Sequence, residues 1–249
     1  MDLGLAGKVA LVTGAGGGMG AAIAAALAVE GCDVHVADTN LGGASRVAAE
    51  CGARAHAMAL DVGDAGAVSG AVEHIAGAHG RLDILVNSAG ILKTGPVADA
   101  SPADWDDVCR VNLSGVFYCC RAALTPMRAQ RYGKIVNIAS VSAMKGGGVF
   151  GNVLYGTTKA GVVALTTGLA RELAPFGINV NAIAPGLADT AMTSRLLTPE
   201  RRKDVEASIP AGRLASLDDI VRVTLLLASD ALAYVNGVTI PVDGGYLTR

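Results

Sequence analysis

Tyr155 and Lys159 are the two side chains whose types and spacing point most directly to chemistry. They stand four residues apart in the segment LYGTTKAG, so on a helix they share one face. A free phenol has a pKa of about 10, which makes it a poor acid or base at neutral pH. A neighbouring ammonium group favours the phenolate form. The pair could then exchange a proton with an alcohol or ketone oxygen.

A glycine-rich segment, TGAGGGMG, covers residues 13–20 and follows the apolar run Val9–Thr13. Its glycines allow positive φ angles and let the backbone approach a ligand closely. A helix that begins near Gly18 would offer free N–H groups and the positive end of its dipole to a pyrophosphate. This position, between a first strand and a first helix, indicates a dinucleotide site. We assign to it Gly14, Gly17, Gly18, Met19 and Gly20.

Asp38 ends the second apolar run, 18 residues after Gly20. A carboxylate there can accept hydrogen bonds from the ribose hydroxyls of NAD and would repel the 2′-phosphate of NADP. No arginine follows Gly14 within the loop to offset that repulsion. We therefore predict NAD as the cofactor, with NADP disfavoured.

Short apolar runs alternate with longer helical patterns along the chain, which implies right-handed crossovers and a parallel sheet with helices on both faces. The predicted strands are Val9–Thr13, Asp33–Ala37, Arg54–Leu60, Leu82–Asn87, Lys134–Ala139, Ile178–Ala184 and Val238–Pro241. The predicted helices include Gly18–Glu30, Leu41–Cys51, Ala65–Ala78 and Pro102–Arg128. We predict an α/β fold, a Rossmann-type doubly wound parallel sheet of about seven strands. No linker divides residues 1–249, so one domain is expected.

The composition argues against several other classes of protein. The chain has 249 residues, 51% of them hydrophobic, and a net charge of −2, so neither nucleic acid nor an anionic membrane is an expected partner. The uncharged stretch Val9–Val29 has the length of a membrane helix, but its glycines would break one. The spacing of the five cysteines and four histidines predicts no metal site. The start, MDLGLAGK, lacks the basic region of a signal peptide, and we expect a cytoplasmic protein.

Five motifs occur in an order typical of one family: TGAGGGMG at 13–20, NSAG at 87–90, Asn112, YGTTK at 155–159 and APG at 184–186. The closing VDGG at 242–245 fits as well. Over essentially its whole length the chain resembles the short-chain dehydrogenase/reductases of the single-domain NAD-type branch. The resemblance implies hydride transfer to or from nicotinamide without a metal. It makes Tyr155 the acid–base group, with Lys159 lowering its pKa and holding the nicotinamide ribose. Asn112 would hold a water in a proton relay to Lys159.

The resemblance also implies a serine that hydrogen-bonds the substrate oxygen, and two serines compete for this role. The usual family spacing, 13 residues before the tyrosine, selects Ser142. The end of the strand in VNIAS selects Ser140 instead, 15 residues before Tyr155. We prefer Ser140 because the strand end fixes its position, while the loop 145–152 can absorb two more residues. Ser142 would then line the substrate pocket. The family commonly has NNAG where this chain has NSAG, a small polar replacement.

Further contacts follow from the resemblance alone. On the cofactor they are Asp61 and Val62 near the adenine, Asn87, Ala89 and Gly90 in the NSAG motif, and Ile183, Pro185, Gly186 and Thr190 near the nicotinamide. The substrate pocket is expected from residues 92–94, 142–154 and 187–209, with Ser142, Met144, Phe150 and Leu187 in contact with the substrate. Val149, Met192, Leu196 and Leu197 would extend an apolar wall, and Lys93, Lys145 and Arg195 are candidate polar groups.

Together these features predict an NAD-dependent oxidoreductase that interconverts a secondary alcohol and a ketone. Two alternatives stay open. An NADPH-using 3-oxoacyl reductase has a similar scaffold, although Asp38 argues against it. A nucleotide-binding regulator without activity is disfavoured by the complete set of Ser140, Tyr155, Lys159 and Asn112. The resemblance also implies a homotetramer, paired through the long helix Pro102–Arg128 and the helix that carries Tyr155.

Overall fold

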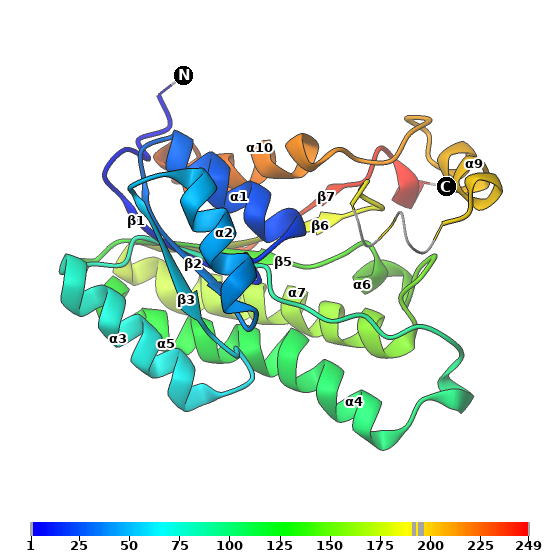
Figure 1. The fold of residues 1–249 in the computed structure, drawn as a ribbon, viewed down its shortest axis with the longest axis horizontal. Helices are drawn as coiled ribbons and strands as arrows, with labels where there is room; N and C mark the ends of the chain where they lie inside the picture. Colours follow the sequence, from blue (N-terminus) through cyan, green and yellow to red (C-terminus); the bar gives the residue numbers. More distant parts are fainter. Residues whose placement is uncertain (1, 191–192, 194–196, 249) are drawn as a thin grey trace.

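A parallel sheet of seven strands forms the centre of the molecule in the computed structural model, which describes residues 2–190, 193 and 197–248 (Figure 1). The strands are β1 (Val9–Thr13), β2 (Asp33–Asp38), β3 (Ala55–Ala59), β4 (Ile84–Asn87), β5 (Gly133–Ile138), β6 (Ile178–Pro185) and β7 (Thr239–Val242). Their order is β3-β2-β1-β4-β5-β6-β7, and every neighbouring pair is parallel. The predicted doubly wound sheet is confirmed, with strand ends shifted by two residues at most.

Helices cover both faces of this sheet (Figure 1). On one face lie α1 (Gly18–Val29), α2 (Leu41–Cys51) and α10 (Leu217–Ala228). On the other lie α3 (Ala65–His79), α5 (Gly115–Gln130) and α7 (Val153–Leu173). Three shorter helices, α4 (Pro102–Cys109), α6 (Ser142–Lys145) and α9 (Pro199–Ser208), stand beyond the carboxyl ends of the strands (Figure 1). No helix in the described part of the chain is long and apolar enough to cross a membrane.

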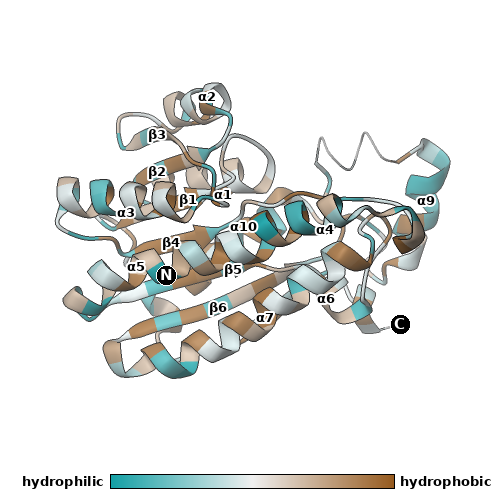
Figure 2. Ribbon diagram, turned by 90° about the horizontal axis from the view of Figure 1, so that it is seen from below, coloured by the Kyte–Doolittle hydropathy of each residue, from teal (hydrophilic) through white to brown (hydrophobic). Residues whose placement is uncertain are grey.

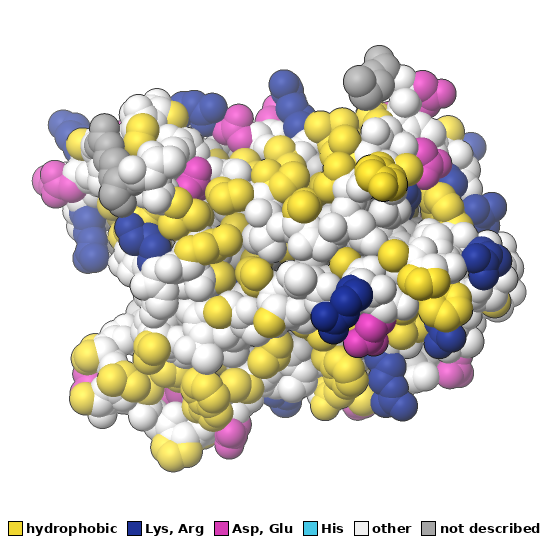
Figure 3. Space-filling model, turned by 180° about the vertical axis from the view of Figure 1, so that it is seen from behind, with side chains coloured by type: hydrophobic (Ala, Val, Ile, Leu, Met, Phe, Trp, Pro, Cys, Tyr) yellow, Lys and Arg dark blue, Asp and Glu magenta, His cyan; other side chains and the backbone are white. Residues whose placement is uncertain are grey.

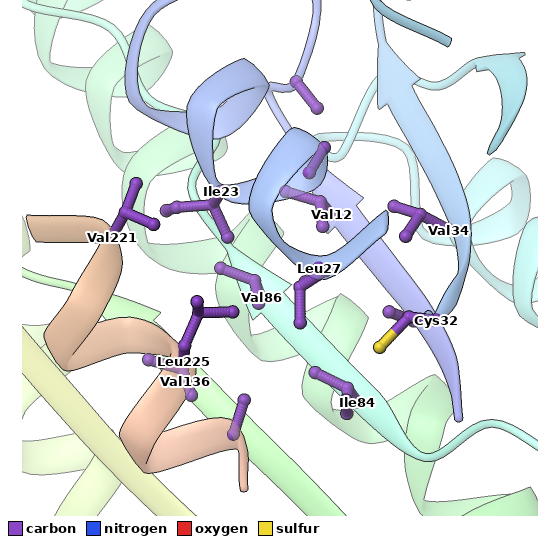
Figure 4. Packing of buried hydrophobic residues seen from close by; sticks show 14 of the residues in the cluster. Val12, Ile23, Leu27, Cys32, Val34, Ile84, Val86, Val136, Val221 and Leu225 are labelled. Carbon is purple, nitrogen blue, oxygen red and sulfur yellow. The ribbon is translucent and has the colours of Figure 1, made fainter. Parts of the chain in front are cut away.

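The core explains why the strands read as continuous apolar runs. Strands β4, β5 and β6 are mostly hydrophobic (Figure 2), as expected for strands buried on both faces, with polar residues at Lys134 and Asn137 in β5 and at Asn179 and Asn181 in β6. Ile23 and Leu27 of α1 point toward Val86 of β4, and α10 packs beside them (Figure 4). Each fully buried side chain of this size stabilises the fold by about 1.5–3 kcal/mol.

The predicted single helix from Pro102 to Arg128 is interrupted in the structure. Helix α4 begins as expected, with Ser101 and Asp104 forming a capping box. A π-helical turn, η2 (Arg110–Ser114), then separates α4 from α5, which continues through Pro126 to Gln130. The buried amide of Asn112 lies in this turn and hydrogen-bonds the backbone of Ile91, outside the helix. Such turns widen a helix by one residue and often occur at functional sites.

The connections reverse direction between β1 and β4. The chain runs outward from β1 to β2 and β3, then returns to β4 and continues to β5, β6 and β7. In open sheets of this type, ligands bind in the crevice outside the carboxyl ends of the strands at the point of reversal. Thr13 and Asn87 end the two strands at that point. The topology therefore brings the glycine-rich loop, the NSAG motif and the end of β5 to one edge.

Candidate active site

A cavity of about 660 Å³ lies at the carboxyl edge of the sheet. Figure 3 shows the surface hollowed on this side, between the part that carries α9 and the part that carries α4. The cavity extends from the glycine-rich loop to the turn η5 (Tyr246–Thr248). Of the predicted site residues, the following line it: Gly14, Gly17, Gly18, Met19, Gly20, Asp38, Asp61, Val62, Ala89, Gly90, Ser140, Ser142, Phe150, Tyr155, Lys159, Gly186, Leu187 and Thr190.

The glycine-rich loop has a shape that only glycine permits at two positions. Gly14 and Gly18 have φ angles of +65° and +57°. A side chain at Gly14 would also place its Cβ 2.6 Å from the Cα of Ala89. Among the described residues, no side chain caps α1, so the N–H groups of its first turn are available to an anion. The loop thus forms a cradle that fits a pyrophosphate.

Replacing Gly14 by alanine is expected to damage this cradle. The positive φ costs about 1–2 kcal/mol for an L-residue, and overpacking against Ala89 adds about 1–3 kcal/mol. We expect a lower Tm and at least about a tenfold rise in the Kd for NADH. Gly70, inside α3 with open space around it, provides the matched control. Gly70→Ala should raise stability by up to about 1 kcal/mol and leave NADH affinity unchanged. Parental Tm and Kd in Gly14→Ala would contradict this account.

Asp38 lies at the end of β2 and faces the glycine-rich loop. Its Oδ2 accepts a hydrogen bond from the N–H of Gly16 at 2.9 Å, and its Oδ1 accepts one from the N–H of Asn40, also at 2.9 Å. A Cβ on Gly16 would lie 2.9 Å from Cγ of Asp38, so a larger residue there would displace the carboxylate. The two backbone donors hold Asp38 in the wall of the cavity, where it can meet a ribose.

Tyr155 stands in the first turn of α7. Asn152 caps this helix and accepts a hydrogen bond from the N–H of Tyr155 at 3.3 Å. Burial raises the pKa of the Tyr155 phenol, and a hydrogen bond with the Ser140 side chain opposes that rise. The Ser140 hydroxyl also accepts the N–H of Ser142 at 3.1 Å. Of the two candidate serines, the structure therefore joins Ser140 to the phenol, while Ser142 lies in the wall of the cavity.

Lys159 lies one turn further along α7 and is 3% exposed. Its Nζ donates to the carbonyl oxygen of Ile138 at 2.6 Å and lies 5.6 Å from the centre of the Tyr155 ring. Burial lowers the pKa of Lys159 to about 8. That Lys159, together with a bound oxidised nicotinamide, lowers the pKa of Tyr155 stays a prediction.

Asn112 is fully buried behind the NSAG motif. Its Oδ1 accepts the N–H of Ile91 at 2.8 Å, and its Nδ2 donates to the carbonyl of Ile91 at 2.9 Å. A Cβ on Gly90 would lie 3.4 Å from this Oδ1 and 3.7 Å from Nζ of Lys159. Asn112 thus holds the loop after β4 against Lys159. Its place in a proton relay stays a prediction.

Comparison with known proteins agrees with this geometry. The family model described as enoyl-(acyl carrier protein) reductase matches residues 14–247. The 3-oxoacyl-(acyl-carrier-protein) reductase FabG of Escherichia coli K12 is 39% identical over 239 residues, 96% of this chain and 97% of that protein. The D-threitol dehydrogenase of Mycolicibacterium smegmatis is 41% identical over 251 residues, 100% of this chain and 96% of that protein. The chain belongs to the short-chain dehydrogenase/reductase family.

A solved structure extends the comparison to three dimensions. A provisionally assigned NAD(P)-dependent gluconate 5-dehydrogenase from Beutenbergia cavernae, with NADP bound at low occupancy, superposes with a TM-score of 0.94. It is 40% identical, and the match covers all of both chains. The short-chain dehydrogenase/reductase fold and an oxidoreductase function are thereby shown, and a nicotinamide cofactor is expected.

In this short-chain dehydrogenase/reductase, Asp61, which was expected near the adenine, is paired with a residue that the sequence did not reveal. Arg110, in the π turn, donates to Oδ2 of Asp61 at 2.8 Å and lines the cavity. A hydrogen bond from the backbone of Gly63 and the pairing with Arg110 lower the pKa of Asp61. Val62 beside it is buried and lines the same wall. The sequence did not reveal this pairing because 49 residues separate Arg110 from Asp61.

Three predicted cofactor residues do not line the cavity. Asn87 points into the sheet, where its Nδ2 donates to Oδ1 of Asn137 at 2.8 Å. Ile183 and Pro185 are buried within β6. Gly186, directly after β6, does line the cavity and packs on Asp243. These three residues therefore shape the edge of the sheet instead of forming the wall.

The part of the cavity expected to take the substrate has Val149, Phe150 and Leu187 in its wall. Met144 was expected there but is 46% exposed and lies outside the wall. Helix α6 is a single turn. Met144 follows the buried Ser142 by two residues, which is a rotation of about 200°, so the two side chains lie on opposite sides of the helix. Leu197 packs instead with the small cluster around α9. The predicted Met192, Arg195 and Leu196 lie outside the described residues.

The two lysines expected as candidate polar groups of the substrate pocket do not line the cavity. Lys93 forms an ion pair with Asp104 at 2.6 Å, and Lys145 lies over the ring of Tyr246 at 4.2 Å from its centre. Tyr246 itself lines the cavity, and sequence reasoning missed it. The signal was present: β7 is parallel to β6, so the residues that follow β7 must reach the same edge.

Proposed function

We propose that this short-chain dehydrogenase/reductase is an NAD-dependent enzyme that interconverts a secondary alcohol and a ketone, with Tyr155 as acid–base group. The observation that carries the proposal is one cavity that holds Asp38 at one end and the Ser140–Tyr155 pair at the other. The cradle of Gly14 and the open first turn of α1 fit the dinucleotide phosphates. When bound, the nicotinamide would accept or donate the hydride.

The side chains of the protein would orient the substrate, transfer the proton and exclude water. Ser140 orients the substrate oxygen by hydrogen bonding, and Tyr155 takes its proton during oxidation or returns it during reduction. Lys159, fixed by the carbonyl of Ile138, holds a positive charge near the phenol while its ammonium is protonated. Val149, Phe150 and Leu187 exclude water around the reacting atoms and favour a substrate with an apolar body.

A second candidate is the NADPH-using 3-oxoacyl reductase. The specific observations in its favour are the 39% identity to a 3-oxoacyl reductase and the NADP in a 40% identical structure. Against it stands Asp38, whose carboxylate would repel the 2′-phosphate of NADPH. An inactive regulator is disfavoured by the joined Ser140 and Tyr155.

Assembly and location complete the proposal. Trp105 and Phe117, on α4 and α5, are each 44% exposed, and Val153 on α7 is 42% exposed. Hydrophobic atoms also gather on the lobe opposite α9 in Figure 3. These surfaces suit the expected pairing of subunits in a homotetramer. A cytoplasmic location is proposed with it.

The cofactor choice provides the test. With a panel of secondary alcohols, kcat/KM should be at least about tenfold higher with NAD than with NADP, because Asp38 repels the 2′-phosphate. Asp38→Ala combined with Thr39→Arg should reverse this preference. NADH and NADPH formation, followed by absorbance, measures both ratios. A parent enzyme that prefers NADP would exclude the NAD assignment, and oxidation of no alcohol with either cofactor would favour the regulator.

A further inference from the structure

Arg46 of α2 contacts the glycine-rich loop at Gly16, the residue that also contacts Asp38. Its Nη2 donates to the carbonyl oxygen of Gly16 at 3.3 Å. The N–H of the same residue, Gly16, is the group that donates to Asp38. One glycine is therefore flanked by a carboxylate and a guanidinium. The absence of an arginine within the loop had been an argument for NAD, yet the fold brings one in from 30 residues away.

The approach depends on Gly43, a glycine in the first turn of α2. A Cβ on Gly43 would lie 2.9 Å from the carbonyl oxygen of Gly16 and 3.3 Å from its Cα. The first turn of α2 thus packs directly on the loop. Arg46 stands three residues further on, on the same face of the helix. This packing brings the guanidinium to the carbonyl of Gly16, the residue whose N–H binds Asp38, just outside the residues that line the cavity.

The guanidinium retains donors for a ligand. Its Nη1 pairs with Glu50 at 2.8 Å, and both side chains are more than half exposed. In the described part of the chain, Arg46 makes these two polar contacts, with Glu50 and Gly16. A guanidinium has five N–H donors and binds phosphate in a forked geometry. The carboxylate of Asp38 already accepts two backbone N–H groups, which weakens its repulsion of a second anion.

We propose that Arg46 is a second cofactor-selecting residue, which contacts a 2′-phosphate on the adenosine ribose and lets the enzyme bind NADP in addition to NAD. The inference rests on the proposed function in that it takes the ribose to lie at Asp38. Asp38 then sets the preference for NAD, and Arg46 keeps the affinity for NADP high enough for the enzyme to bind it. This pair of residues would also explain why a chain with an aspartate at position 38 is so similar to a protein whose structure contains NADP.

Binding of NADH and NADPH to the full chain, followed by nucleotide fluorescence, tests this without a known substrate. Arg46→Ala should raise the Kd for NADPH about tenfold, the loss of one charge-assisted contact, and change the Kd for NADH less than twofold. Rising salt should weaken NADPH binding more in the parent than in this variant. Glu50→Gln, which releases the guanidinium, should lower the Kd for NADPH.

Arg54 provides a matched control. It is 58% exposed, compared with 57% for Arg46, and it also donates to a glycine carbonyl, that of Gly31, at 3.1 Å. It lies at the amino end of the strands, away from the cavity. Arg54→Ala should change neither Kd. The inference fails if Arg46→Ala shifts both dinucleotides equally or neither, or if the parent binds NADH and not NADPH. A parent that binds neither would overturn the proposed function as well.

Discussion

Tyr155→Phe is expected to lower kcat by about 10³-fold or more while NADH affinity stays within about twofold of the parent. The substitution keeps the ring and removes only the hydroxyl that would exchange a proton with the substrate. The dinucleotide is held by other groups, including the cradle of Gly14 and the carboxylate of Asp38. Fluorescence titration with NADH and steady-state oxidation of one active alcohol measure the two quantities.

The pH dependence separates a proton-transfer role from a structural one. Oxidation needs the phenolate, so kcat/KM for the alcohol should rise with pH, while reduction of the ketone, which needs the phenol, should fall. Burial raises the pKa of Tyr155, and the charge of an oxidised nicotinamide opposes this rise. Burial lowers the pKa of Lys159 to about 8, so its charge beside the phenol changes over the measured pH range, and the apparent value belongs to the pair. Substantial turnover by Tyr155→Phe with the parental pH profile would assign the proton transfer to another residue.

Ser140→Ala is expected to lower kcat/KM about 10²-fold, and Ser142→Ala by much less. The Ser140 hydroxyl is hydrogen-bonded with Tyr155, so its loss removes a group aimed at the reacting oxygen. Ser142 lines the cavity, and the hydrogen bond linking it to Ser140 comes from its backbone N–H, which alanine retains. Substitution of Ser142 should therefore mainly alter relative kcat/KM among alcohols of different size.

These two variants control for each other, because both remove one hydroxyl from the same short segment. Thermal denaturation should show Tm values within a few degrees for both, since each loses about 1 kcal/mol at most. The assignment would be reversed by a larger fall in kcat for Ser142→Ala than for Ser140→Ala. Equal small losses in both would mean that neither serine positions the substrate oxygen.

The fold was predictable because the hydrophobic runs in the sequence coincide with the strands of the sheet. The apolar runs that end at Thr13, Asn87 and Ile138 are buried on both faces, so their boundaries follow the hydrophobic residues closely. The long helix was the main error. Periodicity and the Ser101 cap predicted its beginning correctly, but the π turn around Asn112 depends on a hydrogen bond with Ile91, a contact from another element that periodicity does not contain.

The site was predictable where a residue sits at the end of a strand. Asp38 and Ser140 were located in this way, and both line the cavity. Met144 was misplaced because its side-chain orientation depends on α6, a helix of one turn. A segment this short has no hydrophobic periodicity from which the buried side could be predicted. Arg46 and Tyr246 were missed for a different reason. Arg46 reaches the Gly16 carbonyl through the packing of α2 on the glycine-rich loop, and Tyr246 reaches the cavity because β7 lies beside β6.

The parallel sheet has a consequence for how the chain is made. No strand pairs with its neighbour through a hairpin, so every pairing waits for an intervening crossover to be synthesised. The first four strands can form a sheet β3-β2-β1-β4 once residue 87 has emerged, but β4 then presents an apolar, unpaired edge. Its partner β5 begins only at Gly133. During that interval the edge is open to strands of other nascent chains, and unpaired strand edges of this kind favour aggregation.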